Sequence, residues 1–280
     1  MVDRAQESVS SGVIGLSRVT DRLLGTRAEY GDEAYDSILR MHMAYNHDAL
    51  GNHYGMTLEG DLSLPGTEER VELVFESDNP DDPADRDREL RGEGTDVRQY
   101  LGLRFLNPFR FVKTETSFRI PGRLPMELRS QLRAWQDFQP GTWHLRPRVT
   151  VFDASATGTG YTMDLSLRRP VGNDMQFQSS TAATWFRREA QYYYDQTLSL
   201  IQPLGRRREI VWQIGAAGES EPEDRLTLYY AQFSWRRVVY RDWLLLEVRP
   251  QARRAIEDGF IPEFRFYLGL DLLFGHHTAY

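Results

Sequence analysis

The 280-residue chain contains no cysteine, which excludes disulfide frameworks, thiolate metal sites and cysteine nucleophiles. Lysine is almost absent as well, because Lys113 is the single lysine among 34 basic residues and all the others are arginine. Long apolar runs are also missing. The mean hydropathy is −0.55, and no segment approaches the roughly 20 consecutive apolar residues that a membrane-spanning helix needs. The sequence therefore excludes a helical membrane protein.

The net charge and the first residues of the chain bear on which partners the protein binds and in which compartment it lies. The net charge is −7 and the isoelectric point is about 5.5, which argues against general binding of nucleic acid. Met1-Val2-Asp3 leads directly into polar sequence, and no signal peptide is visible. The chain is then either cytosolic or a mature form with an added start methionine, and the strand pattern described next favours the second interpretation.

From Ile38 onward apolar and polar residues alternate with a period of two, which is typical of β-strands. The longest alternating run is Phe264–Phe274, and its eleven residues without proline are about enough for a tilted strand to cross the apolar layer of a bilayer. One face of this run is entirely apolar and is expected to face lipid. Its residues are Phe264, Phe266, Leu268, Leu270, Leu272 and Phe274.

The spacing of turn residues predicts about fourteen strands, with twelve as the main alternative. Six connections are short and should all lie at one end, on the periplasmic side. They are Pro65–Arg70, Asn107–Pro108, Asp137–Thr142, Pro170–Asp174, Leu204–Arg206 and Tyr240–Arg241. The long connections 77–96, 217–224 and 253–262 fall at the opposite end, and this asymmetry is expected of a membrane barrel. The acidic loop 77–96 is expected to be mobile, or to bind cations or a partner. Pro147 indicates a bulge in its strand.

The number of strands decides which face points inward. Side chains can fill a barrel of about eight strands, but twelve to fourteen strands enclose too wide a space for apolar packing. The charged face is then expected to line a wet lumen and the apolar face to contact lipid. Aromatic residues near the strand ends fit the girdles of a membrane barrel. A soluble two-sheet β-sandwich is the alternative, although its strand lengths and turns should be less regular.

The inward-facing charged residues form the largest candidate site. We expect them either to form a ladder of ion pairs that stiffens the wall or to form a selectivity ring, and the two roles are compatible. Within the set, Arg129, Arg133, Arg146 and Arg148 come from two successive strands and could form a positive stripe that favours anions. The full set is Glu59, Asp61, Glu72, Arg104, Glu115, Glu127, Arg129, Arg133, Arg146, Arg148, Asp164, Arg168, Glu247, Arg249, Arg265 and Asp271.

Residues 3–24 show a helical period, with an apolar stripe that ends before Gly25. This helix is expected to pack on a neighbouring surface or to enter or cap the barrel, and a disordered tail is the third possibility. The predicted domains are therefore 1–37 for the helix and linker, 38–274 for the barrel and 275–280 for a short tail.

The sequence offers little sign of catalysis. His47 and His53 lie in the first external loop but match no strong metal signature. There is no phosphate-binding glycine loop and no nucleophile elbow. We expect no enzyme activity, no metal and no cofactor.

One motif within the final strand resembles a known signal. The pattern Tyr267-x-Gly269-x-x-Leu272-x-Phe274 is similar to the closing strand of Gram-negative outer-membrane β-barrels. The resemblance covers roughly residues 38–274 and departs from the class at the end, because Phe274 is followed by six further residues. It implies an outer-membrane location, contact with the lipid bilayer and recognition by the barrel-assembly machinery. A periplasmic or envelope protein is a further candidate partner.

Three functions are compatible with such a barrel. The leading expectation is a porin-like channel for small polar or anionic solutes. The second is a translocator plugged by residues 3–24, since a helix before a barrel of this size resembles the translocator unit of autotransporters. The third is a closed barrel that binds a partner or stabilises the envelope.

Overall fold

The structure is a computed structural model that describes the barrel almost completely. The described residues are 6, 9–15, 37–49, 51–64, 67, 71–77, 99–108, 112–121, 128–154, 158–172, 174–221 and 223–275. The other residues of the predicted helix 3–24, nearly all of the loop 77–96, Glu127 and the tail after Gly275 lie outside this set.

Fourteen antiparallel strands form one closed barrel in which each strand pairs with its neighbours along the chain. The strands are β1 (Ile38–Asp48), β2 (Gly51–Ser63), β3 (Val71–Ser77), β4 (Gln99–Pro108), β5 (Lys113–Pro121), β6 (Arg129–Trp135), β7 (His144–Ala154), β8 (Gly158–Val171), β9 (Met175–Phe186), β10 (Gln191–Pro203), β11 (Arg208–Glu219), β12 (Arg225–Tyr240), β13 (Leu244–Ala255) and β14 (Glu263–Gly275). This confirms the prediction of fourteen strands rather than twelve.

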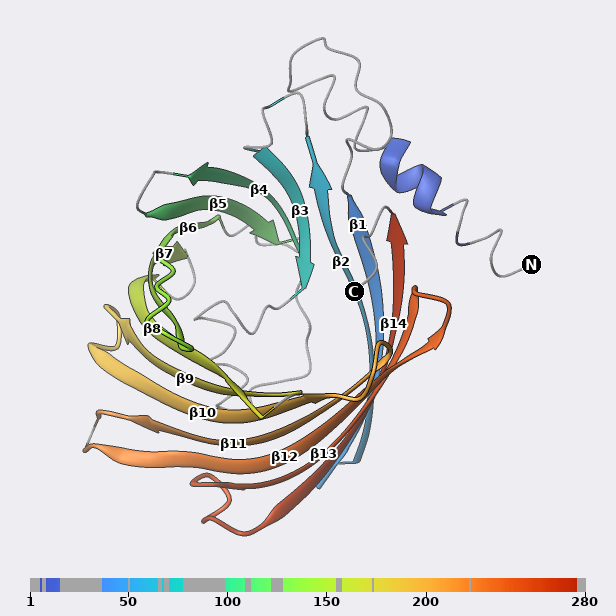
Figure 1. Ribbon diagram of the computed structural model, residues 1–280. Coiled ribbons are helices and arrows are strands. Elements are labelled where there is room, and N and C mark those ends of the chain that lie inside the picture. Colours follow the sequence, from blue (N-terminus) through green and yellow to red (C-terminus); the bar gives the residue numbers. More distant parts are fainter. Residues whose placement is uncertain are drawn as a thin grey trace.

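The first and last strands close the barrel, as Figure 1 shows. β1 and β14 pair antiparallel over ten residue pairs, from Ile38 opposite Gly275 to His47 opposite Phe266. Closure leaves no open edge with unpaired backbone groups, which a sheet in lipid requires. The predicted pairing of the strand near Leu39 with the strand Phe264–Phe274 is therefore confirmed.

The connections sort to the two ends of the barrel as predicted. The six short connections join β2 to β3, β4 to β5, β6 to β7, β8 to β9, β10 to β11 and β12 to β13, so an up-and-down barrel places all of them at one end. The two long strand-to-strand connections within the described part, after β11 and after β13, lie at the other end. They span only 220–224 and 256–262, because β11 continues to Glu219 and β13 to Ala255. They are therefore no longer than the connections 64–70 and 136–143 at the first end, and the predicted contrast in length is not found between these connections.

The bulge predicted at Pro147 is not found. β7 keeps a continuous register with β8 from His144 to Ala154, and Pro147 lies opposite Leu165. The missing N–H of Pro147 points toward β6, where the ladder of paired residues already ends at Trp135. Because few ladder hydrogen bonds are lost there, the strand does not need to bend. The register shifts fall instead at Ala217/Gly218 and Val238/Tyr240.

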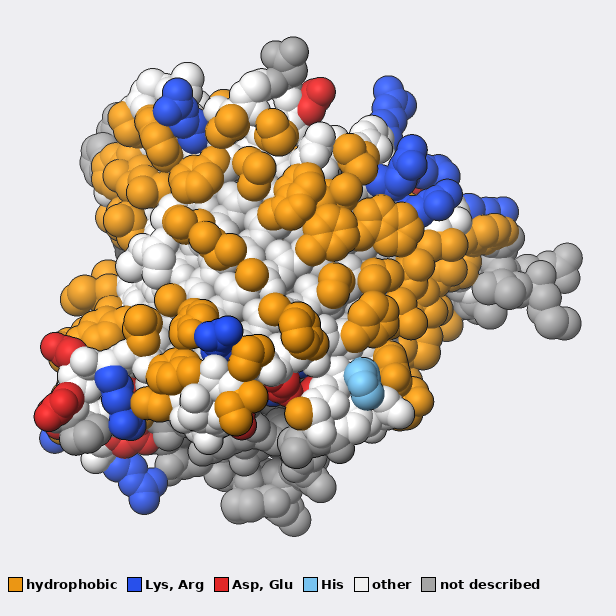
Figure 2. Space-filling model, turned by 90° about the horizontal axis from the view of Figure 1, so that it is seen from below, with side chains coloured by type: hydrophobic (Ala, Val, Ile, Leu, Met, Phe, Trp, Pro, Cys, Tyr) orange, Lys and Arg blue, Asp and Glu red, His pale blue; other side chains and the backbone are white. Residues whose placement is uncertain are grey.

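The outer wall is apolar. Tyr54 on β2 and Phe264 on β14 are 80% and 76% exposed, and Figure 2 shows hydrophobic side chains spread over the wall with charged groups toward its edges. A soluble protein rarely exposes an apolar surface of this extent, whereas a barrel in lipid requires one. Within the described residues no helix has the length and hydrophobicity to cross a membrane.

The described part of the N-terminal helix lies outside the barrel (Figure 1). Val13 is buried against Leu62 and Phe274, which belong to the lipid-facing sides of β2 and β14. The Ser10 hydroxyl accepts a hydrogen bond of 2.9 Å from the backbone N–H of Gly275, and the Gln6 amide donates one of 3.4 Å to the carbonyl of Leu273. Residues 9–15 therefore cover the closing seam from outside and do not occupy the lumen.

Candidate functional site

One side of the lumen carries a network of ion pairs between neighbouring strands. Arg104 on β4 lies 3.1 Å from both Asp61 and Glu72 and 3.5 Å from Glu115, measured between guanidinium nitrogen and carboxylate oxygen. Arg133 on β6 lies 3.5 Å from the same Glu115 oxygen. Glu72 with Arg104 and Glu115 with Arg133 are directly opposite pairs on adjacent strands, while the long side chain of Arg104 also reaches Glu115 diagonally and Asp61 across β3.

The four arginines proposed as a positive stripe have different surroundings. Arg148 makes two hydrogen bonds of 3.1 and 3.2 Å to the carboxylate of Asp164. Arg129 is buried and stacks its guanidinium 4.6 Å from the ring centroid of Tyr100. Arg133 contacts Glu115, as described above. Arg129, Arg133 and Arg148 are thus each held by a partner within the wall. This arrangement fits the predicted ladder that stiffens the wall.

The fourth arginine of the stripe, Arg146, lies near the short-connection end and is exposed. Its guanidinium donates a short hydrogen bond to Asp137, which also lies 3.1 Å from Lys113. The hydrogen bond from Arg146 is the main cause that holds the pKa of the Asp137 carboxyl below its usual range. Arg146 therefore belongs to an exposed charge cluster at the barrel end.

A cavity of about 890 Å³ opens in the lumen toward the same end, and Asp61 and Arg104 of the network also line it. Eight arginines and five carboxylates border it, together with His42 and Tyr267. The arginines are Arg40, Arg104, Arg206, Arg207, Arg208, Arg236, Arg237 and Arg249. The carboxylates are Glu59, Asp61, Glu209, Glu247 and Asp271. Arg208 and Arg237 belong to the outward-facing rows of β11 and β12 and reach only the rim, so six arginines and five carboxylates remain inside the cavity, an excess of one positive charge.

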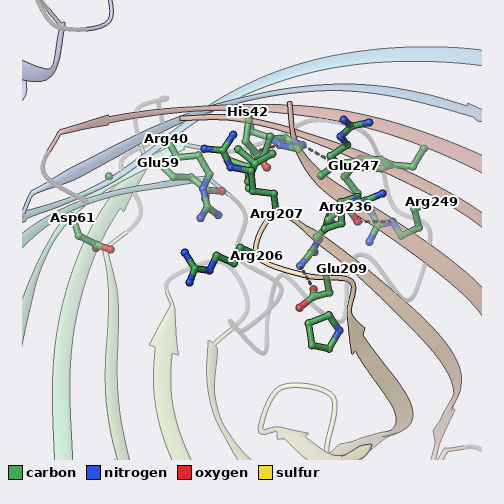
Figure 3. A pocket seen from close by; sticks show the side chains of 18 of the residues that line it. Arg40, His42, Glu59, Asp61, Arg206, Arg207, Glu209, Arg236, Glu247 and Arg249 are labelled. Atoms are coloured by element: carbon green, nitrogen blue, oxygen red, sulfur yellow. Dashed lines mark hydrogen bonds and ion pairs between the residues drawn. The ribbon is translucent and has the colours of Figure 1, made fainter. Parts of the chain in front are cut away.

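Figure 3 shows where the labelled side chains of the cavity lie. Arg206 and Arg207, from the connection between β10 and β11, extend into the space that Arg40 and Glu59 border from β1 and β2. On β12, Arg236 lies between Glu247 at 3.1 Å and Glu209 at 3.9 Å. Arginines from separate strands and a turn thus surround one wet volume, where their planar guanidinium groups suit carboxylate or phosphate oxygens.

A hydrogen-bonded chain of three residues crosses the closing seam beside this cavity. The Tyr267 hydroxyl lies 2.5 Å from Nε2 of His42, and Nδ1 of His42 lies 2.6 Å from an oxygen of Asp271. The Arg249 guanidinium lies 4.3 Å from the centroid of the Tyr267 ring. These contacts tie β1, β13 and β14 together on the lumen side, in addition to the backbone pairing of the seam.

The remaining predicted lumen residues fall into smaller groups. Glu247 accepts a hydrogen bond of 2.9 Å from Ser234, and Arg265 lies 3.2 Å from Glu263. Arg168 is exposed near the end of β8. Glu127 lies outside the described residues. The predicted set is thus divided between the packed wall, the cavity and the barrel ends.

Several cavity residues are missing from the predicted set. Arg40 and His42 alternate with the apolar residues of β1, so the same pattern could have placed them in the lumen. Arg236 lies in β12 directly before Arg237, so the residue types alone do not say which of the two arginines faces the lumen. Arg206 and Arg207 belong to a short connection, and strand alternation gives no direction for turn residues. Only the tertiary structure shows them at the cavity.

His47 and His53 lie in the last residues of β1 and the first residues of β2 rather than in a loop, because the two strands pair almost to the turn, and their contacts are local. Nδ1 of His47 lies 2.7 Å from the side-chain oxygen of Asn52, and Nε2 of His53 lies 3.3 Å from Asp48. No group of three or more potential metal ligands occurs among the described residues.

No protein-family model matches the sequence, and no curated protein matches it either. Solved structures do resemble the barrel. OmpTdeltaL8, a loop-deletion mutant of OmpT, an outer membrane protein of Vibrio cholerae, matches with a TM-score of 0.52 and 7% identity over 86% of this chain and 99% of that one. The outer membrane channel DcaP of Acinetobacter baumannii matches with a TM-score of 0.51 and 9% identity over 86% of this chain and 97% of that one.

A bacterial polysaccharide outer membrane secretin matches with a TM-score of 0.53 and 10% identity, over 86% of this chain and 98% of that one. Likeness at this level of identity establishes the fold. The chain has the fold of outer-membrane β-barrels, as a closed antiparallel barrel of fourteen strands.

Proposed function

We propose that this protein is a channel of the bacterial outer membrane that passes small anionic solutes. The observation that carries the proposal is the arginine-rich cavity of about 890 Å³ at one mouth of the lumen. The fold supports it, because solved barrels of this shape include an outer membrane channel.

Charge supports a preference for anions. Lumen charges of one sign concentrate ions of the opposite sign and raise their permeability. The arginines of the packed wall sit against carboxylates or rings, whereas Arg206 and Arg40 form no ion pair with another described residue. The cavity, rather than the predicted stripe on β6 and β7, is thus the part of the lumen whose positive charge is available to a solute.

The position of the N-terminal helix bears on the alternative function, a translocator whose lumen is plugged by residues 3–24. Residues 9–15 pack on the outer wall through Val13, so this part of the N-terminal segment leaves the lumen unobstructed. Deletion of residues 2–30 is therefore expected to leave the conductance nearly unchanged. A clear rise in conductance after the deletion would instead support the plugged translocator.

The decisive measurement is single-channel conductance of the refolded protein in a planar bilayer, with ion selectivity taken from the reversal potential in a salt gradient. We expect stable current steps and a reversal potential of the sign for anion preference. Replacement of Arg206 and Arg207 by glutamine should shift the permeability ratio toward unity. The matched control is the double glutamine variant of Arg187 and Arg188, an arginine pair in the connection at the opposite end that does not border the cavity.

Insertion without current would contradict the channel and leave a closed barrel that binds a partner or stabilises the envelope. Current with cation preference would contradict the anionic substrate. An equal shift in both double variants would show that overall charge, rather than the cavity, sets the selectivity.

A further inference from the structure

Two arginines lie directly opposite each other on the outer face of the barrel, at the end with the short connections. Arg208 on β11 pairs with Arg237 on β12 in the strand register. Their neighbours Glu209 and Arg236 point into the cavity (Figure 3), and adjacent residues of a strand point to opposite faces. Arg208 and Arg237 therefore lie on the lipid-facing side. They are the last pair of the β11–β12 ladder at this end and also reach the rim of the cavity.

Apolar residues border this pair on the side toward the barrel middle, and the wall ends on the other side. The next outward pair toward the barrel middle is Ile210 opposite Trp235, followed along β11 by the exposed Trp212. Both arginines are exposed, and neither forms an ion pair with another residue that the structure describes. Figure 2 shows basic side chains gathered at one edge of the apolar wall. The pair thus sits where the apolar wall ends, which is the level of lipid headgroups.

Like charges directly opposite on adjacent strands repel each other and destabilise a sheet. An anion between them removes the repulsion, and guanidinium groups bind phosphate oxygens with paired, charge-assisted hydrogen bonds. Ile210 and Trp235 supply an apolar surface immediately beside the pair, so that a ligand with both a phosphate and acyl chains matches the whole patch. We propose that Arg208 and Arg237 form a binding site for the phosphate of an anionic phospholipid headgroup in the adjoining leaflet.

The pair reaches the rim of the cavity, but its test measures retained lipid and not current, so the proposal can hold or fail whether or not the lumen conducts. A matched control is Arg169 on β8, which is also outward-facing and exposed near the same end. It lies opposite Phe177 rather than another arginine, and its guanidinium stacks 5.3 Å from the Trp143 ring. Arg169 therefore tests whether any outward arginine at this end suffices.

The experiment is native mass spectrometry of the refolded protein, released from micelles that contain equal amounts of phosphatidylglycerol and phosphatidylcholine. We expect wild-type barrels to retain phosphatidylglycerol in preference to phosphatidylcholine. The double variant R208Q/R237Q should lose about tenfold or more of the bound phosphatidylglycerol, since each arginine near a lipid surface contributes about 1 kcal/mol. R169Q should retain it. The mobility of unheated protein in electrophoresis verifies that each variant is folded.

Three outcomes would overturn the proposal. Equal retention of the two lipids by wild type would show that only the apolar wall binds them. Equal loss in R169Q would show a general effect of charge. Displacement of phosphatidylglycerol by excess inorganic phosphate would show a phosphate site that does not require a lipid, whereas no displacement supports the lipid headgroup as the ligand.

Discussion

At the scale of single residues, the contrast between Arg146 and Arg148 explains why the predicted stripe has no single role. Both lie on the lumen face of β7 and are two residues apart. Arg148 faces Asp164, whose side chain is only 8% exposed, while Arg146 pairs with Asp137, which is 40% exposed. Loss of a partner lowers the free energy of unfolding more at a buried pair than at an exposed one, because water cannot solvate the charge that remains.

Replacing Arg148 by glutamine is therefore expected to lower the free energy of unfolding by about 2–4 kcal/mol, because it leaves the Asp164 carboxylate without its bidentate partner. The same replacement of Arg146 should cost about 0–1 kcal/mol, as is usual for exposed pairs. Urea titration of the barrel in lipid vesicles, followed by tryptophan fluorescence, measures both. Equal losses in the two variants would contradict the difference in burial.

At the scale of one element, the closing strand β14 shows why its motif contains a glycine. A Cβ atom added to Gly269 would lie 2.6 Å from the hydroxyl oxygen of Tyr267, whose ring bends over the glycine. That hydroxyl is held by His42 and the ring is covered by Arg249. The ring cannot move aside without losing these contacts, so Gly269 allows the tyrosine to bind across the seam.

Replacing Gly269 by alanine should lower the free energy of unfolding by about 1–3 kcal/mol, the usual range for overpacking. In the double variant Y267A/G269A the added methyl group meets no ring, so the alanine at 269 should cost much less than it does alone. Gly55 on β2 is the control, since no atom lies within 4 Å of a Cβ added there. If the free-energy losses of Y267A and G269A simply add in the double variant, or if G55A loses as much as G269A, this packing explanation is wrong.

At the scale of the whole molecule, closure between β1 and β14 turns a sheet of hairpins into a barrel. Met43 and Leu270 lie directly opposite each other across the seam. The chain contains no cysteine, so a pair introduced there can bond only to itself within one molecule. Opposite residues of paired strands have Cα atoms about 4.5–5.5 Å apart, which a disulfide can bridge.

Mild oxidation of the variant M43C/L270C is expected to cross-link the folded barrel in high yield, detected as a change in mobility of the unfolded protein on non-reducing electrophoresis. In the control M43C/L268C the second cysteine is moved by two residues along β14, and it should cross-link far less. Similar yields for the two variants would mean that the seam has no fixed register, in disagreement with the paired strands.

The alternation of apolar and polar residues along the chain was sufficient to predict most of the barrel architecture. Alternation in β14 and the sorting of short and long connections predicted fourteen strands, closure and an apolar outer face, because a period of two fixes the face of every residue in a strand. The same rule assigned Arg148 and Asp164 to one face on neighbouring strands. It could not show which arginines would be neutralised, since that depends on the register between strands.

The parts that only the tertiary structure decided lie where the period of two does not apply. Arg206 and Arg207 sit in a turn, and their position at the cavity follows from how the connection between β10 and β11 packs against the barrel mouth. The helical stripe with Val13 showed an apolar face but not its partner, and the described helix lies on the outside of the seam. Strand alternation is a local property of the chain, whereas turn direction, helix docking and cross-strand register arise from contacts between distant residues.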